Sequence, residues 1–154
     1  LSAAGAEEAS TASRGLLEAI QVSAAMSAPV VTLADSMTVE EFLRSQAVHH
    51  PFTTYPLHDS TGALTGVVRL NQIMRAARGD QGATLGQLAL AISDMPSARP
   101  DDNLAALIQR LGSDLDRRVL VFDGGKLVGI LSPSDVARML SVRQAMASRS
   151  PAAA

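Results

Sequence analysis

Residues 119–140 read VLVFDGGKLVGILSPSDVARML, and this stretch decides the fold. Two mostly apolar runs, Val119–Phe122 and Lys126–Leu131, flank Asp123-Gly124-Gly125, which is a strong signal for a tight β-hairpin turn. After the second run, apolar residues follow at helical spacing at Val136, Met139 and Leu140. The stretch therefore predicts two antiparallel strands followed by a helix.

An upstream segment repeats this pattern. Leu64, Gly66, Val67 and Ile73 recur as Leu127, Gly129, Ile130 and Val136, each 63 residues further on. Earlier markers recur at slightly longer offsets, with Asp59 matching Asp123 and with Thr38-Val39 and Phe42 matching Asn103-Leu104 and Leu107. Solenoid repeats have periods of about 20 to 50 residues, so two copies at this spacing indicate a duplicated domain.

Each copy predicts the same order of elements. A short extended segment, Val30–Leu33 or Pro96–Ala98, precedes a helix. Thr38 and Glu41 have the spacing of a capping box, and Asn103 is the corresponding cap in the second copy. Two strands and a closing helix follow, the strands being Tyr55–His58 and Leu64–Val68 in the first copy and Val119–Phe122 and Lys126–Leu131 in the second.

The composition excludes several classes of protein. The formal net charge is -2 and only four of the 154 residues are aromatic, whereas nucleic-acid surfaces need a basic excess and often stacking rings. No cysteine is present, which removes disulfides and thiolate ligands. The longest apolar runs fall far short of the roughly 20 residues of a membrane span. We expect a cytoplasmic chain with no nucleic-acid partner, cut from a longer protein.

The element order and several motifs resemble a pair of cystathionine beta-synthase (CBS) domains, a Bateman module, over about residues 21–142. The motifs that carry the resemblance are Met26-Ser27-Ala28-Pro29, Thr38-Val39-Glu40-Glu41, Tyr55-Pro56-Leu57 with Asp59, Gly66-Val67-Val68, Val119 to Asp123, and Gly129-Ile130-Leu131-Ser132-Pro133-Ser134-Asp135. The resemblance implies an α/β fold of tandem CBS domains, in which two β-α-β-β-α repeats pack about a pseudo-twofold axis. The expected parts are a linker or N-terminal helix (1–20), repeat 1 (21–80), repeat 2 (81–143) and a flexible tail (144–154).

The run from Gly129 to Asp135 resembles the motif with which the family contacts nucleotides. An Asp in the first turn of a helix can accept two ribose hydroxyls, and a Ser with free backbone N–H groups at the helix start suits phosphate oxygens. Ser132 and Asp135 are also spaced as a capping box, with Pro133 at the first helical position. A helix cap and a ligand site both remain open, and one pair of residues can serve as both.

The resemblance also implies the remaining ligand contacts. The full expected set is Asp135, Ser132, Ser134, Arg118, Ile130, Phe52, Thr53, Thr32, Ser27 and Val30. Phe52 either stacks on adenine or anchors a loop or core, and Arg118 stands at a phosphate-contacting position. The neighbouring Arg117 is interpreted as part of a solvated charge cluster. Candidate ligands are AMP, ADP, ATP and S-adenosylmethionine, and no cofactor is required.

The first copy departs from the motif, because it has Arg69 and Gln72 where a Ser or Thr and an Asp are expected. We therefore expect at most one nucleotide per chain. The three histidines lack a metal-ligand spacing, and there is no H-E-x-x-H pair or G-x-x-x-x-G-K loop. These patterns favour a chain without catalytic residues or a metal site.

Two functions remain as hypotheses. The first is a regulatory sensor in which an adenine-type ligand binds one cleft between the repeats and controls an attached enzyme or membrane protein. The second is a ligand-free dimerisation and interaction module. The lead into the repeats resembles the cytosolic C-terminal part of bacterial site-2-type intramembrane zinc metalloproteases. A homodimer is expected through apolar residues of the closing helices, namely Ile73, Met74, Val136, Met139 and Leu140.

Overall fold

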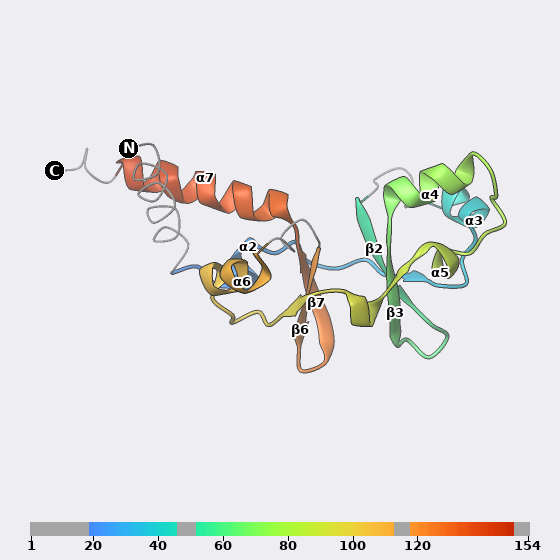
Figure 1. The fold of residues 1–154 in the computed structure, drawn as a ribbon, viewed down its shortest axis with the longest axis horizontal. Coiled ribbons are helices and arrows are strands. Elements are labelled where there is room, and N and C mark those ends of the chain that lie inside the picture. The colour runs from blue at the N-terminus through green and yellow to red at the C-terminus, as the bar shows by residue number, and fades with distance from the viewer. Residues whose placement is uncertain (1–18, 46–51, 113–117, 150–154) are drawn as a thin grey trace. The chain divides into compact units, whose positions relative to one another are not determined.

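The computed structural model describes residues 19–45, 52–112 and 118–149 (Figure 1). The chain divides into two compact units. In the described part, unit 1 comprises residues 19–29 and 96–149, and unit 2 comprises residues 30–95. Some of the expectations fall outside the described residues: those for residues 1–18 of the linker, for residues 150–154 of the tail, for Arg117 and for two of the three histidines, His49 and His50.

Unit 1 contains a three-stranded sheet with helices. Its elements are α2 (Val22–Ala25), β5 (Ser97–Ala98), α6 (Leu104–Leu111), β6 (Val119–Asp123), β7 (Lys126–Leu131) and α7 (Pro133–Arg149). The strand order is β5-β6-β7, with β5 parallel to β6 and β6 antiparallel to β7. The apolar side chains of these elements form one buried core, which includes Val22, Leu104, Leu107, Val121 and Leu131.

The β6–β7 hairpin confirms the turn that the sequence predicts. Asp123 pairs with Lys126, so Gly124 and Gly125 are the two turn residues. Their φ angles are 59° and 83°, a left-handed backbone that residues with a Cβ rarely adopt. Two successive positive φ values match the twist of the flanking strands, so this turn fixes the register of the hairpin.

Unit 2 contains a four-stranded sheet with the order β1-β2-β3-β4. Its elements are β1 (Leu33–Ala34), α3 (Val39–Arg44), β2 (Thr54–His58), β3 (Leu64–Arg69), α4 (Leu70–Ala77), α5 (Leu85–Leu88), β4 (Leu90–Ala91) and the 3-10 helix η2 (Ile92–Asp94). Strand β1 is parallel to β2, while β2–β3 and β3–β4 are antiparallel. The buried core includes Phe42, Tyr55, Leu57, Val68 and Ile73. The β-α-β-β-α order is therefore confirmed in both copies.

The compact units do not follow the sequence repeats. Helix α2 lies at the start of the first repeat, yet Val22 is fully buried in the core of unit 1, and Leu104 N donates to Ile20 O over 2.9 Å. Helix α5 lies at the start of the second repeat in the same way, yet Leu85 is buried in the core of unit 2, and its backbone N donates to Met37 O over 2.8 Å. Each unit thus combines most of one repeat with the first helix of the other.

The helix caps agree with the sequence. Thr38 Oγ1 accepts a hydrogen bond from Glu41 N at 3.1 Å, and Asn103 Oδ1 accepts one from Ala106 N at 3.0 Å. These contacts satisfy backbone donors that the first helical turn leaves without partners.

Two local expectations need correction. The first extended segment was expected at Val30–Leu33, but β1 is Leu33–Ala34, because only these residues pair with β2. Helix α7 continues through residues 144–149, which were expected in the flexible tail, since Gln, Ala, Met and Arg are good helix formers.

Among the residues that the structure describes, no helix is both long enough and apolar enough to span a bilayer.

Candidate ligand-binding site around Asp135

Asp135 is one of two buried polar residues among those described, with 5% of its surface exposed. Its Oδ2 accepts hydrogen bonds from Ser132 N at 2.8 Å and from Ser132 Oγ at 2.9 Å. Its Oδ1 accepts from Ser27 Oγ at 3.1 Å and from Arg138 Nη2 at 2.6 Å. A buried carboxylate needs such partners, because an unpaired charge in a dry environment is costly.

The strand-to-helix junction places this carboxylate. Strand β7 ends at Leu131, α7 begins at Pro133, and Asp135 therefore lies in the first turn of the helix. Ser132 Oγ accepts from Asp135 N at 3.2 Å while Asp135 accepts from Ser132 N, so the two residues cap the helix reciprocally. The capping interpretation is thus confirmed, and it does not exclude a ligand at the same carboxylate.

Ser27 reaches Asp135 because α2 belongs to the same unit. The backbone of Ser27 is fixed by two hydrogen bonds with Ile130, from Ser27 N to Ile130 O at 2.8 Å and from Ile130 N to Ser27 O at 3.1 Å. Gly129 leaves room for the side chain of Met26, the residue before Ser27, which a Cβ at position 129 would meet. The structure therefore brings together Ser27, Ile130, Ser132 and Asp135, four residues of the expected ligand-binding set.

The other six residues of the expected set are divided between the two units. In unit 1, Ser134 is exposed in the first turn of α7, and Arg118 is half-buried directly before β6. The expected residues of unit 2 are Val30, Thr32, Phe52 and Thr53. Thr32 and Thr53 are exposed and Val30 is half-buried, and Thr32 Oγ1 lies 3.1 Å from His58 Nδ1.

Phe52 is not a core residue, because half of its surface is exposed. Its ring meets the buried Tyr55 edge to face, with the centroids 6.0 Å apart, and its backbone N donates to Tyr55 Oη at 2.8 Å. The core interpretation of Phe52 is therefore wrong. An anchored but exposed ring remains compatible with stacking on a flat ligand.

The first copy has the same helix start without the carboxylate. Arg69 N donates to Gln72 Oε1 at 3.0 Å, as Ser132 N does to Asp135 Oδ2 at 2.8 Å. An amide oxygen thus supports α4 where a carboxylate oxygen supports α7. The two positions serve the same structural purpose but differ by one negative charge.

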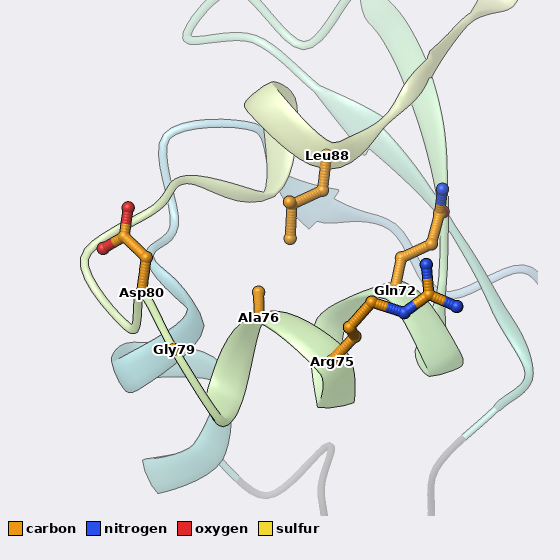
Figure 2. Close-up of a pocket in the computed structure, with 6 residues that line it drawn as sticks. All are labelled: Gln72, Arg75, Ala76, Gly79, Asp80 and Leu88. Carbon is orange, nitrogen blue, oxygen red and sulfur yellow. The ribbon is translucent and has the colours of Figure 1, made fainter.

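A pocket of about 290 Å³ lies beside α4 in unit 2. Figure 2 shows Leu88 of α5 facing Ala76 of α4 across it, with Gln72 and Arg75 at one end and Asp80 at the other. Asp80 Oδ1 already accepts a hydrogen bond from Gly82 N at 3.0 Å. Sequence reasoning did not predict this pocket, because α5 was not recognised as a helix of this unit.

A second hollow, of about 660 Å³, lies where β1 and β2 end, and Asp35, His58 and Asp59 are among its lining residues. Hydrogen bonds from the Thr61 side chain and backbone lower the pKa of Asp59. Asp35 Oδ2 accepts from Thr65 Oγ1 at 3.1 Å. Across the described ranges, no group of three or more potential metal ligands is close enough together to hold an ion.

The chain contains two copies of one α/β unit, and one copy has a carboxylate at its strand-to-helix junction. These two features place the chain in a class of proteins built from paired domains. The model of the CBS domain family matches residues 21–79 and again residues 86–142. The chain therefore belongs to the CBS domain family, as its motifs predict.

Three comparisons extend this result. The chain is 35% identical over 142 residues to "Putative zinc metalloprotease Rip3" of Mycobacterium tuberculosis, and this alignment covers 91% of the chain but only 36% of the relative's length. The CBS domain of a bacterial CNNM/CorC family Mg2+ transporter, solved in complex with ATP, has a TM-score of 0.70 and 18% identity, and covers 88% of this chain and 96% of its own.

The third comparison is with the CBS domain pair of protein MJ0100, solved in complex with 5'-methylthioadenosine and S-adenosyl-L-methionine. Its TM-score is 0.65 and its identity is 19%, with 80% of this chain and 98% of that chain covered. Both solved structures show the CBS fold for this chain.

Proposed function

We propose that this chain is a regulatory module that binds an adenine nucleotide or a related adenosyl ligand through Asp135. The observation that carries the proposal is a buried carboxylate in the first turn of α7, held beside the Ser27 and Ser132 hydroxyls. Such a group can accept the hydroxyls of a ribose, and adjacent hydroxyls and helix N–H groups suit phosphate. The ATP and adenosyl complexes of two similar CBS structures support the same ligand class.

The complete ligand-binding set of this proposal includes residues from both copies. Arg118 would contact phosphate and Phe52 would stack on the base, and the other members are Ser27, Val30, Thr32, Thr53, Ile130, Ser132, Ser134 and Asp135. We propose no ligand at Gln72, because its amide supplies no charged acceptor for a ribose.

The output of the module would be the activity of an attached protein. The chain spans 36% of the length of the mycobacterial relative, whose name describes a zinc metalloprotease. We propose a parent of that type, in which this chain lies on the cytosolic side and regulates the protease without catalysing a reaction itself.

Titration calorimetry tests the ligand proposal. We expect AMP, ADP, ATP or S-adenosylmethionine to bind with a stoichiometry of one per chain. A ligand that binds the native state also raises the unfolding temperature, so a thermal shift panel gives an independent readout. Two equivalents per chain would contradict the asymmetry between Asp135 and Gln72, and no binding of any of the four would reject the sensor.

A dimerisation module is the second candidate, and exposed apolar residues of α7 favour it. Val142 is 48% exposed and Met146 is 57% exposed. Most of the residues that the sequence predicts at the dimer interface are covered by their own unit. Ile73 is buried in one core, and Val136, Met139 and Leu140 pack against the other. Only Met74 of that set, at 42% exposure, is an exposed large apolar residue.

We expect light scattering to report a particle of about twice the 16.0 kDa chain mass at micromolar concentration. Replacing Met146 by Asp would place a charge on the exposed apolar face of α7 and should return the particle to the mass of one chain. Gln144→Asp is the matched control, because it places the same charge at an exposed position on the opposite side of α7 from Met146. A wild-type particle of 16.0 kDa would contradict the dimer.

A further inference from the structure

The acceptor capacity of Asp135 is already filled by the protein. A carboxylate offers about four lone-pair positions on its two oxygens. Four donor groups occupy them: Ser27 Oγ and Arg138 Nη2 at Oδ1, and the backbone N and Oγ of Ser132 at Oδ2. A ligand that donated two ribose hydroxyls to this carboxylate would therefore have to displace two of these donors.

The two oxygens differ in how firmly their partners are held. Oδ2 is bound within the reciprocal cap, in which Ser132 N donates to Asp135 and Asp135 N donates to Ser132. Breaking those contacts would uncap α7. Oδ1 is bound by two side chains, so Oδ1 is the oxygen at which partners can be exchanged without disturbing the helix start.

Arg138 is the partner that can leave at the smallest cost. Its side chain is 65% exposed, whereas the side chain of Asp135 is 7% exposed. The Arg138 side chain can move further into water at a small cost in buried surface, because most of the side chain is already exposed. Ser27 keeps its position through its two backbone hydrogen bonds with Ile130, although its hydroxyl can rotate.

We propose that Arg138 is a latch on the ligand site: its guanidinium occupies Oδ1 of Asp135 and competes with the ribose hydroxyls for that oxygen. This inference rests on the proposed function, since competition requires a ligand that uses Asp135. The latch keeps the buried carboxylate paired, and it lowers the affinity of the site by the free energy that the Arg138–Asp135 contact contributes. Arg138 is thus a regulatory residue of the site and was not in the expected ligand-binding set.

The test uses adenosine, which carries the ribose hydroxyls but no charge. Removing a cation therefore changes no long-range attraction to the probe. We expect Arg138→Met to bind adenosine about threefold to tenfold more tightly than the wild-type chain in calorimetry. Arg138→Lys keeps a cation near Oδ1 and should stay within about twofold of wild type. A loss of structure alone would weaken binding, so a tighter complex is a specific signature of the latch.

Arg143→Met is the matched control, because it removes the same charge from the same helix and Arg143 makes none of the contacts to Asp135 described above. The control should bind adenosine as the wild-type chain does. Adenosine binding that is detectable for Arg138→Met but not for wild type, in a wild-type chain that still binds one of the four ligands, would support the latch most strongly. If wild type binds and Arg138→Met binds equally or more weakly, the latch is rejected and the sensor stands. If neither binds any adenine compound, both proposals are rejected.

Discussion

Replacing Asp135 by Asn will weaken the binding of an adenine nucleotide by about 10-fold to 150-fold. The variant loses the negative charge that accepts the ligand hydroxyls, and a charge-assisted hydrogen bond contributes about 1.5 to 3 kcal/mol. The helix start should survive, because an amide oxygen can accept from Ser132 N as Gln72 Oε1 accepts from Arg69 N at 3.0 Å. Calorimetry with the nucleotide that binds wild type most tightly measures the change.

Gln72→Ala is the matched control, since Gln72 has the corresponding position at the start of α4. Its substitution removes one capping contact and should leave nucleotide affinity within about twofold of wild type. Unfolding curves of both variants check that neither has lost its fold. An Asp135→Asn variant that binds like wild type, or a Gln72→Ala variant that loses affinity equally, would contradict the assignment of the site to Asp135.

The elements that the sequence predicts well depend on contacts between near neighbours. The Gly124-Gly125 turn, the Thr38 cap and the Asn103 cap each involve residues within three or four positions of each other, so local backbone preferences suffice. The capping pair of Ser132 and Asp135 belongs to the same kind. These features fix where strands and helices begin and end.

The exchange of α2 and α5 between the repeats could not be predicted in this way. Each of these helices has four residues, too few to show a helical period. Their positions depend on distant partners, as in the contact of Ser27 with Asp135, which lie 108 residues apart. Resemblance placed Ser27 in the ligand-binding set, but spacing alone gives no reason for it.

Helical periodicity also left the dimer residues undecided. It shows that Ile73, Val136 and Met139 lie on apolar helix faces, but not whether a face covers the core of its own unit. The contact between Arg138 and Asp135 could have been predicted from the sequence, because the two residues have the i, i+3 spacing of neighbours on a helix. The ligand motif ends at Asp135 and gives no role to the residue one turn further along.

Replacing Phe42 by Ala will lower the free energy of unfolding by about 3 to 5 kcal/mol. Phe42 is fully buried in the core of unit 2, and its ring meets Tyr55 edge to face with the centroids 5.5 Å apart. Truncation removes the largest side chain of α3 from that core and leaves a cavity that the surrounding strands can fill only in part. Urea denaturation followed by far-UV circular dichroism measures the loss.

Phe52→Ala is the control for the same substitution at an exposed ring. Phe52 also meets Tyr55 edge to face, but half of its surface is exposed, so we expect a loss below about 1 kcal/mol. The two variants separate a structural ring from a candidate ligand contact: Phe42→Ala should destabilise the chain, whereas Phe52→Ala should weaken adenine binding in a folded chain. Equal losses of stability in both variants would contradict this division, because the division rests on the difference in burial between the two rings.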